Sequence, residues 1–299
     1  MKINSKVYAI VVVYNGKSWI AKCITSLRNS SIPLHLIVID NNSSDGSAEY
    51  IETHFPEIEL IRSEKNLGFG GANNMGMRRA VVDNADFVFL LNQDAWIDKN
   101  TVKDLLIAFE IHNEYGILSP FHLDYKGINN ERYFNDYVLK HYTAGYNDYK
   151  DRLDQSELLS CTFVHAACWL LPINTVKQVG GFDPLFFHYG EDNDYVQRLI
   201  NKGLKIGIVS KATLYHQGTN EGLLNPSKNI RFLTNQLLLR IKHPGASHVG
   251  AFSLFCRQFF LSHFRKTTIE ERKSLSNVLM KLIKIFRSRV IQKNKEAYL

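Results

Sequence analysis

Short apolar runs alternate with amphipathic segments along the first part of the chain. The runs are continuous and rich in valine, isoleucine and leucine, and they lie at 7–15, 34–40, 57–64 and 86–92. Strands buried on both faces of a parallel sheet have this pattern. The segments between them repeat apolar residues at helical spacing, most clearly over 18–30. The alternation predicts an α/β fold with a Rossmann-like, mainly parallel sheet flanked by helices.

Polar residues follow each of these four runs. Strands of such a sheet run in one direction, so their carboxyl ends meet at the edge where open α/β sheets bind ligands. The segments at this edge are Tyr14–Asn15, Asp40–Asn42, Asn66–Gly71 and Asn92–Asp94. The sequence therefore predicts a ligand site built from four loops.

The second half of the chain is less regular. Residues 119–160 are rich in tyrosine and asparagine with weak periodicity, so we expect a long insertion or edge strands there. A strand-like run at 161–172 follows. A helix from about Glu191 to Gly203 and a final pair of strands over 204–218 complete this half.

The C-terminal part has a helical pattern and is strongly basic. From Arg240 onward there are 13 lysines and arginines against 3 acidic residues, whereas the whole chain has 36 against 29. Apolar residues share one face of a predicted helix over 274–292, namely Leu275, Val278, Leu279, Leu282, Phe286 and Val290. A basic amphipathic helix suits an anionic membrane surface, although a helical pair packed on the body or on a second subunit has the same pattern. We expect the C-terminal part to contact a membrane surface, and we expect no nucleic-acid partner. The same pattern is compatible with a homodimer.

Cysteine usage and hydropathy bear on the compartment. The four cysteines show no CxxC spacing, which indicates reduced thiols and neither a zinc site nor a disulfide framework. No apolar run approaches the ~20 residues of a membrane span, and the N-terminus shows no cleavable leader. We expect a cytoplasmic protein, peripheral on the inner face of the cell membrane.

Four motifs occur in an order that resembles one known family. They are VVVYNG, VIDNNSSDGS, NLGFGGANNMG with LLNQDA, and GGFDPLFFHYGEDNDYVQRL followed by YHQG. Together they resemble the inverting glycosyltransferases of family 2, which have the GT-A fold, over residues 6–220. The NQDA variant and the C-terminal layout resemble the rhamnosyltransferase-like branch that builds bacterial O-antigen and capsule polysaccharides. The resemblance implies a nucleotide-binding half at 1–118, an acceptor-binding half at 119–235 and a basic helical tail at 236–299.

The resemblance also implies a reaction and roles for single residues. A sugar would pass from a nucleotide diphosphate sugar, a dTDP- or UDP-sugar, to a saccharide or lipid-linked acceptor. Asp94 matches the last aspartate of the family's DxD motif and, with His216, would hold Mg²⁺ or Mn²⁺. Asp192 matches the general base and Glu191 a supporting carboxylate. The positions that match nucleotide contacts are Tyr14, Asn15, Asp40, Asn42, Asn66, Gly68, Gly71, Asn74 and Asn92.

Several of these residues also have a purely structural interpretation. Asp94 could cap the following helix, although Asp98 and Asn100 are better placed to do so. The acidic residues after Gly190 could simply favour a helix start. Tyr14 could pack in the core, and a strand-end histidine such as His216 is usually structural.

Three further side chains receive structural assignments. Asp194 is expected on a helix surface or in an ion pair with Arg198, four residues later. His165 and His188 are both expected to be structural.

Competing functions remain open on the sequence alone. A sugar-phosphate nucleotidyltransferase shares the sheet and the metal, but the loop after the first strand lacks its glycine-rich, basic character. A catalytically silent nucleotide-sugar-binding protein would not need the Glu191–Asp192 pair. A dehydrogenase is disfavoured because the glycines at 68–71 lack GxGxxG spacing and follow the third strand. The absence of a QxxRW-like segment favours a single sugar addition over polymerisation.

Overall fold

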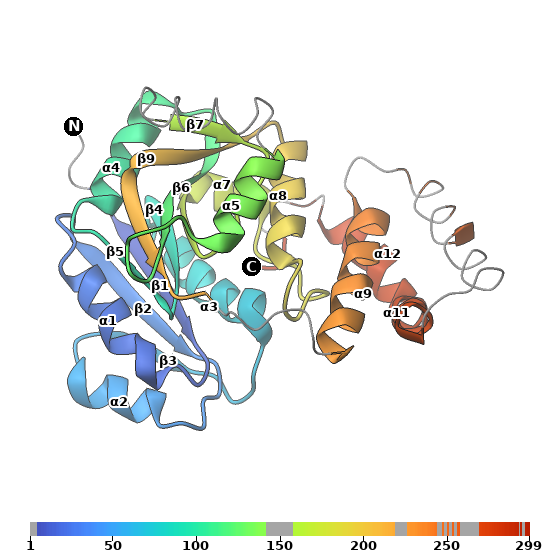
Figure 1. The fold of residues 1–299 in the computed structure, drawn as a ribbon, viewed down its shortest axis with the longest axis horizontal. Helices are drawn as coiled ribbons and strands as arrows, with labels where there is room; N and C mark the ends of the chain where they lie inside the picture. The colour runs from blue at the N-terminus through green and yellow to red at the C-terminus, as the bar shows by residue number, and fades with distance from the viewer. Residues whose placement is uncertain are drawn as a thin grey trace.

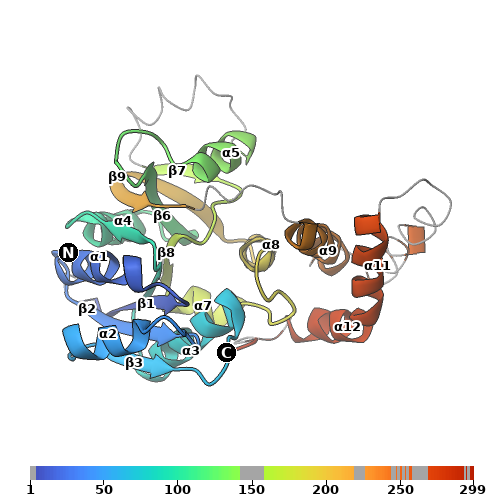
Figure 2. The same cartoon turned by 60° about the horizontal axis from the view of Figure 1, so that its bottom comes forward.

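A single mixed sheet forms the centre of the molecule, with helices on both faces (Figure 1, Figure 2). The computed structural model describes residues 5–141, 158–218, 226–243, 269–292 and 297–299, with residues 247, 250, 253, 256, 257 and 294. Within these residues the strand order is β3-β2-β1-β4-β8-β6-β9-β5, and β7 pairs with β9.

The first four strands form the parallel part of the sheet. They are β1 (Val7–Val13), β2 (Leu34–Asp40), β3 (Glu59–Arg62) and β4 (Phe87–Asn92). β1 lies between β2 and β4 and pairs in parallel with both, and Asp40 stands opposite Val13 while Asn92 stands opposite Val12. The four predicted strands are thus confirmed, and their polar carboxyl ends do meet at one edge.

The remaining strands extend the sheet beyond β4. They are β5 (Ala95–Ile97), β6 (Tyr115–Asp124), β7 (Leu158–Cys161), β8 (Cys168–Pro172) and β9 (Lys205–His216). β8 is antiparallel to β4, and β6 is antiparallel to β8 and parallel to β9. The prediction of a strand pair over 204–218 is wrong. One long strand occupies this segment because β9 pairs with β7 near its start and with β5 at its end.

The segment predicted as an insertion or edge strands starts inside the sheet. β6 reaches Asp124 between β8 and β9, so it is an internal strand. A helix that the sequence did not predict, α5 (Arg132–His141), follows it. Phe134 anchors α5, because its fully buried ring packs 5.0 Å from that of Phe121 and 4.8 Å from that of His122. Residues 142–157 lie outside the described part of the chain.

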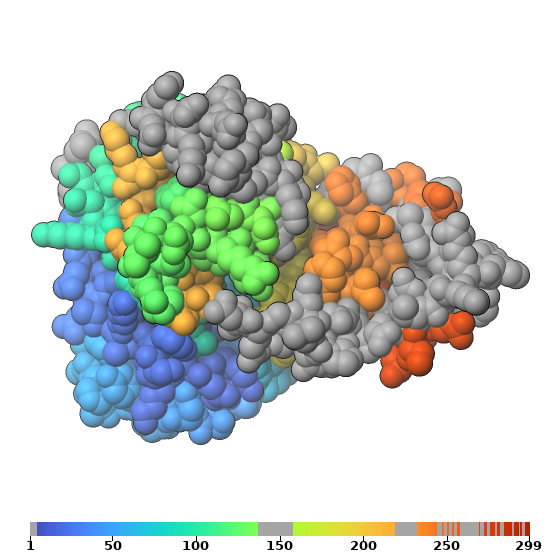
Figure 3. Space-filling view, viewed as in Figure 1, coloured from blue at the N-terminus to red at the C-terminus, as the bar shows by residue number. Residues whose placement is uncertain are grey.

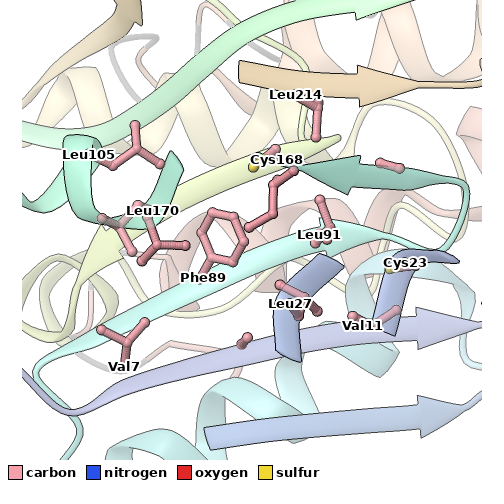
Figure 4. Packing of buried hydrophobic residues seen from close by; sticks show 14 of the residues in the cluster. Val7, Val11, Cys23, Leu27, Phe89, Leu91, Leu105, Cys168, Leu170 and Leu214 are labelled. Atoms are coloured by element: carbon pink, nitrogen blue, oxygen red, sulfur yellow. The ribbon is translucent and has the colours of Figure 1, made fainter. Parts of the chain in front are cut away.

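Besides α5, six helices in the described part of the chain cover the two faces of the sheet. They are α1 (Lys17–Arg28), α2 (Ser47–His54), α3 (Gly68–Val82), α4 (Thr101–Ile111), α7 (Ile173–Val179) and α8 (Glu191–Asn201). The sheet separates two hydrophobic clusters, one under α3, α7 and α8 and the other under α1, α2 and α4. Figure 4 shows the second cluster, where Phe89 and Leu170 of the sheet pack near Leu105 of α4. Each such side chain contributes about 1.5–3 kcal/mol when fully buried.

Three helices from the C-terminal part lie on the α8 side of the sheet domain, with α9 nearest to α8 and α11 beyond α9 (Figure 1, Figure 2). They are α9 (Pro226–Lys242), α11 (Ile269–Met280) and α12 (Leu282–Ile291). The single helix predicted over 274–292 is wrong, because the chain breaks at Lys281 into α11 and α12. Of its predicted apolar face, Val278 is buried but Val290 is 59% exposed. The side chains of Leu275, Leu279 and Leu282 lie outside the described residues.

The C-terminal helices are docked on the sheet domain through an apolar contact and through the chain end. Phe186, in the loop before α8, shares a third hydrophobic cluster with Leu238 of α9 and Ile285 of α12. The carbonyl of Ala297 accepts a 2.7 Å hydrogen bond from the Gly181 amide. In the described part of the chain, no helix combines the length and the apolar character needed to cross a membrane.

Candidate active site

The loops after β1 and β2 are tied together by hydrogen bonds. Asn15, at φ 50°, accepts from the Ser44 amide at 2.8 Å through its side chain, and its amide donates to Ser43 Oγ at 3.0 Å. Tyr14 precedes it and is 46% exposed, so core packing of its ring is excluded. Asn42 is also exposed and left-handed, at φ 67°. These positions form a surface rim at the carboxyl edge of the sheet.

Asp40 offers an acceptor atom inside this rim. Its side chain is buried, and Oδ2 accepts from the Ser43 amide at 3.2 Å. Oδ1 is buried without a hydrogen-bond partner among the described residues. A buried acceptor is normally paired, so an unpaired one at a ligand edge is suited to an N–H donor of a bound group.

Gln93 is a site residue that sequence reasoning missed. Its side-chain Oε1 accepts from the Tyr14 amide at 2.9 Å, and its Nε2 donates to the Tyr14 carbonyl at 3.3 Å. The amide side chain therefore continues the strand pairing between β1 and β4 past the end of the sheet. Its place inside the NQDA motif, between two candidate ligands, was the available signal.

The glycine-rich segment packs against the protein itself. A Cβ on Gly68, which has φ +74°, would come within 2.0 Å of the Phe187 carbonyl oxygen. At Gly71 the nearest atom would be the Cβ of Leu67 at 3.1 Å, which is a looser fit. Asn66 accepts through Oδ1 from the Gly68 amide at 2.8 Å and from Asn41 Nδ2 at 3.0 Å. The sequence predicts that the backbone at Gly68 approaches a ligand closely. In the structure this close approach is made to the loop before α8.

Asn74 requires a correction. The sequence places it where the helix begins, as a nucleotide contact, but it lies in the middle of α3 and is 4% exposed. Its Nδ2 donates to the Phe182 carbonyl at 2.8 Å, and its Oδ1 accepts from the Phe182 amide at 2.7 Å. Both amide atoms are engaged in joining α3 to the segment before α8, which gives Asn74 a structural role.

Asp94 and His216 face each other across the paired strands β5 and β9. His216 Nε2 lies 3.4 Å from Asp94 Oδ1 and 3.5 Å from Asn92 Nδ2. Burial alone would raise the pKa of Asp94, but the hydrogen bond and charge of His216 outweigh it and hold the pKa below its usual range. Burial would lower the pKa of His216, and Asp94 reverses that shift. Asn92 Oδ1 is buried without a hydrogen-bond partner in the described residues.

The alternative helix-cap assignment is also corrected. Asn100 is the N-cap residue of α4, yet no side-chain hydrogen bond caps that helix. The Asp98 carboxylate instead accepts from the Tyr215 hydroxyl at 3.3 Å. Asp94 does not cap α4 either, because its carboxylate lies beside the His216 ring.

Glu191 and Asp192 open α8 directly after the left-handed Gly190. Burial, and next the charge of Asp192, raise the pKa of Glu191 to about 8. Burial also raises the pKa of Asp192, which accepts from the amide and side chain of Asn193 at 2.7 and 3.0 Å. Glu191 Oε2 is buried without a hydrogen-bond partner among the residues described. A carboxylate with a raised pKa is a stronger base than a free one, as proton abstraction near neutral pH requires.

The loop between β7 and β8 lies between the Asp94–His216 pair and the Glu191–Asp192 pair. The Ala166 amide donates to the Asp192 carboxylate. The neighbouring His165 ring lies with its centroid 5.9 Å from that of His216. Asp94, His216, Glu191 and Asp192 are therefore arranged around one short loop.

A buried charge network, which the sequence did not predict, holds α8 to the C-terminal helices. Lys242 of α9 donates to Asp194 of α8 and lies 2.8 Å from Asp183 Oδ2. Arg198 pairs with Asp194 at 2.9 Å, which confirms the expected i,i+4 pair, although Asp194 is buried and not on the surface. Burial would raise the pKa of Asp183, but Lys242 outweighs burial and lowers it.

A second contact from α9 fixes the loop before the acidic pair. Asn235 Nδ2 donates to the His188 carbonyl at 3.1 Å and also to the Tyr189 carbonyl. These carbonyls lie two and three residues before Glu191. The C-terminal helices thus contact the segment that positions the candidate base.

The family model for glycosyl transferase family 2 matches residues 8–180, more than half of the chain. The protein belongs to this family, and within it resembles the rhamnosyltransferase-like branch. The N-acetylglucosaminyl-diphospho-decaprenol L-rhamnosyltransferase of Mycobacterium tuberculosis is 25% identical over 71% of this chain and 76% of its own length. The dTDP-rhamnosyl transferase RfbF of Shigella flexneri is 24% identical over 81% of this chain and 82% of its own length. The chain spans 55% of the low-salt glycan biosynthesis hexosyltransferase Agl10 of Haloferax volcanii, at 27% identity over 57% of this chain.

Solved structures confirm the GT-A fold. S. aureus TarS 1-349 in complex with UDP-GlcNAc superposes with a TM-score of 0.56 at 17% identity, covering 97% of this chain and 84% of that one. Mannosyltransferase PcManGT from Pyrobaculum calidifontis, in complex with GDP-Man and Mn²⁺, also gives 0.56, at 14% identity, over 97% and 85%. Together with the family match, the fold identifies the protein as a glycosyltransferase.

Proposed function

We propose that the protein transfers one hexose, such as rhamnose, from a nucleotide diphosphate sugar to a saccharide acceptor, with inversion at the anomeric carbon. The observation that carries this proposal is the arrangement of the Asp94–His216 pair and the Glu191–Asp192 pair around the loop that holds His165 and Ala166. Displacement needs a base on the acceptor side and a positive charge on the leaving-group side. The two pairs fit these two requirements.

The residues around Asp94 fit a divalent cation. Mg²⁺ and Mn²⁺ prefer oxygen ligands and commonly take one or two carboxylates, with substrate phosphates and water completing the shell. Asp94 provides an ionised carboxylate of lowered pKa, His216 a nearby imidazole, and Asn92 Oδ1 a buried oxygen without a partner among the described residues. When bound, the cation would stabilise the charge of the departing diphosphate. PcManGT, which has the same fold, was solved in complex with both GDP-Man and Mn²⁺, in keeping with this assignment.

Asp192 is the proposed base. It takes the proton of the acceptor hydroxyl as the oxygen bonds to the anomeric carbon and the bond from that carbon to the diphosphate oxygen breaks. The Asn193 and Ala166 donors orient its carboxylate. Glu191 lies beside it with a raised pKa, so it is protonated near neutral pH and can donate a hydrogen bond to the acceptor.

The rim of the sheet is the proposed nucleotide site. The exposed ring of Tyr14 can stack on a base, and Asp40 Oδ1 can accept its imino N–H. Thymine and uracil both carry such a group, in agreement with the dTDP in the name of the Shigella relative and the UDP-GlcNAc bound by TarS. The name of the mycobacterial relative supports an acceptor saccharide carried on a lipid diphosphate.

With a lipid-linked acceptor, the enzyme would act at the inner face of the cell membrane. Lys284, Arg287 and Val290 recur every three residues on α12, and all three are exposed. Basic and apolar side chains on one helix face suit an anionic lipid surface. We expect Lys284→Glu with Arg287→Glu to weaken binding to vesicles containing anionic lipid, while Lys99→Glu, on the exposed turn before α4, does not. Equal vesicle binding by all three proteins would contradict the membrane proposal.

The decisive experiment measures nucleoside diphosphate release with a saccharide acceptor. Wild type should lose activity in EDTA and regain it with Mn²⁺, and NMR of the product should show the inverted anomer. Asp94→Ala and Asp192→Asn should each lower kcat by about 10²–10⁴-fold. Asp98→Asn, which alters an exposed aspartate near Asp94, should keep wild-type activity. Full turnover by Asp94→Ala, or full turnover in EDTA, would refute the metal assignment, and an unimpaired Asp192→Asn would refute the base.

A further inference from the structure

Three potential metal ligands converge next to the candidate active site. His122 lies on β6, Glu131 directly before α5, and His165 in the loop between β7 and β8. One ligand atom from each lies within 4.8 Å of the others, and this is the one such group among the described residues. His122 and Glu131 are 0% and 4% exposed. The cluster is built from three separate segments, unlike a run of surface side chains.

The hydrogen bonds of His122 define which ring nitrogen can bind a metal. Ser119 Oγ donates to the Cys168 carbonyl at 2.8 Å, so it must accept from His122 Nε2, which lies 2.9 Å away. Nδ1 therefore carries the lone pair, and it is buried without a hydrogen-bond partner in the described residues. Metal-binding histidines typically donate their other N–H to such a second partner, which fixes both tautomer and ring orientation.

The other two ligands are oriented as well. Glu131 Oε2 accepts from the Phe134 amide at 2.6 Å and lies 3.7 Å from His165 Nε2. The His165 ring packs edge to face on His122, with centroids 4.7 Å apart.

We propose that His122, Glu131 and His165 form a second cation site, which takes Zn²⁺ or a similar transition-metal ion. Two imidazoles and one carboxylate are a typical zinc set, whereas Mg²⁺ and Mn²⁺ favour oxygen-rich shells. Tetrahedral ligands about 2.1 Å from zinc are about 3.4 Å apart, so the side chains would move together by up to about 1.4 Å on binding. A set of three protein ligands leaves one coordination position for water.

Such an ion would cross-link elements that shape the active site. It would join β6 and the turn before α5 to the loop whose Ala166 amide donates to Asp192. That loop also places His165 beside His216. The site is distinct from the proposed cation site at Asp94, and it does not depend on the identity of donor or acceptor.

Zinc binding by the full-length protein tests this proposal. After dialysis against a chelator, the protein is titrated with Zn²⁺ in competition with a chromophoric chelator, and metal content is measured by mass spectrometry. Wild type, Asp94→Ala and His35→Ala, which removes an exposed histidine, should each bind one tight Zn²⁺ per chain. His165→Ala and Glu131→Gln should bind it at least about 100-fold more weakly.

Two readouts keep the test independent of folding defects in the variants. Zn²⁺ should raise the Tm of wild type but not that of His165→Ala, because a ligand that binds only the folded state stabilises it. Co²⁺ bound to wild type should give the strong visible absorption of a tetrahedral site. Absence of tight Zn²⁺ binding in wild type would overturn the proposal. So would loss of binding in Asp94→Ala together with retention in His165→Ala, since the only cation site would then be the one at Asp94.

Discussion

Replacement of Lys242 by methionine removes the central cation of the network that docks the C-terminal helices on α8. The Lys242 side chain is 1% exposed, lies 2.8 Å from Asp183 Oδ2, and donates to Asp194. Methionine keeps most of the apolar stem, so the change tests the charge and not the packing. Asp194 would still pair with Arg198 at 2.9 Å. Asp183 would lose its ion pair with Lys242 and keep its hydrogen bonds from Ser288 and the Leu185 amide.

The magnitude follows from burial and distance. At an effective dielectric constant of about 20, two unit charges 2.8 Å apart attract by about 6 kcal/mol, most of which is offset by the desolvation of both groups. Removing one partner leaves the desolvation of the other uncompensated, which costs about 3–5 kcal/mol. Since domains are stable by about 5–15 kcal/mol, Lys242→Met should lower the free energy of unfolding by a large fraction.

Urea unfolding followed by fluorescence and circular dichroism measures this loss. The matched control is Lys205→Met, because Lys205 Nζ lies 3.5 Å from Glu114 in a half-exposed pair that contributes at most about 1 kcal/mol. A Lys242→Met loss no larger than that of the control would refute the reasoning. The same outcome would mean that the C-terminal helices are not held to α8 by this network.

Two further predictions concern single carboxylates. Glu191 has a folded pKa of about 8, above its ordinary value of 4.5, so the folded state binds the extra proton and stability falls as pH rises between these values. Glu191→Gln should therefore have a larger free energy of unfolding than wild type at pH about 9, by on the order of 1 kcal/mol or more, with no gain at pH about 4. Urea unfolding at the two pH values measures the difference, and equal pH profiles would contradict the reasoning. Asp40→Ala should weaken UDP binding in calorimetry by about tenfold, through loss of one hydrogen bond to the base, and leave cytidine diphosphate binding unchanged. An equal effect on both nucleotides would contradict the proposed contact.

The parts of the fold that could be predicted from sequence are those fixed by local patterns. Continuous apolar runs identified β1 to β4, because a strand buried on both faces has no polar side to present. The direction of parallel strands then placed Asp40 and Asn92 at one edge before any contact was known. The acidic pair could be found because Glu191 and Asp192 match a motif of the family, and the structure places them at the start of α8.

The remaining features depend on contacts between distant segments. Asn74 has an ordinary position in a helix, and only the approach of Phe182, 108 residues later, commits its amide to the backbone. Lys242 looks like one more cation of a basic tail, yet it is buried against Asp194, 48 residues earlier. Likewise, the histidine and glutamate cluster has no motif spacing, since its members become neighbours only when β6 and the loop before β8 pack together.

The missing first carboxylate of the DxD motif leads to a final prediction. Asn92 Oδ1 is buried without a hydrogen-bond partner among the described residues, and Nδ2 lies 3.5 Å from His216 Nε2. If Asn92 faces the proposed cation beside Asp94, Asn92→Asp adds a second negative ligand at the same position with almost no change of shape. The added charge should lower the Mn²⁺ concentration for half-maximal activity by about tenfold, which corresponds to about 1.4 kcal/mol of binding free energy. The gain is smaller than the full Coulomb attraction because burial of the new carboxylate offsets part of it.

The Mn²⁺ dependence of activity separates this outcome from an effect on His216 alone. A carboxylate that met only the histidine would stabilise the imidazolium and leave half-saturation by Mn²⁺ unchanged or weaker. Gln93→Glu is the control, because it adds the same charge one residue away on a side chain bonded to Tyr14. A tenfold shift in Asn92→Asp that is absent in Gln93→Glu would locate the cation at the first motif position. Equal responses would mean that Asp94 holds the cation without help from residue 92, because the added charge then acts only through the general field of the site.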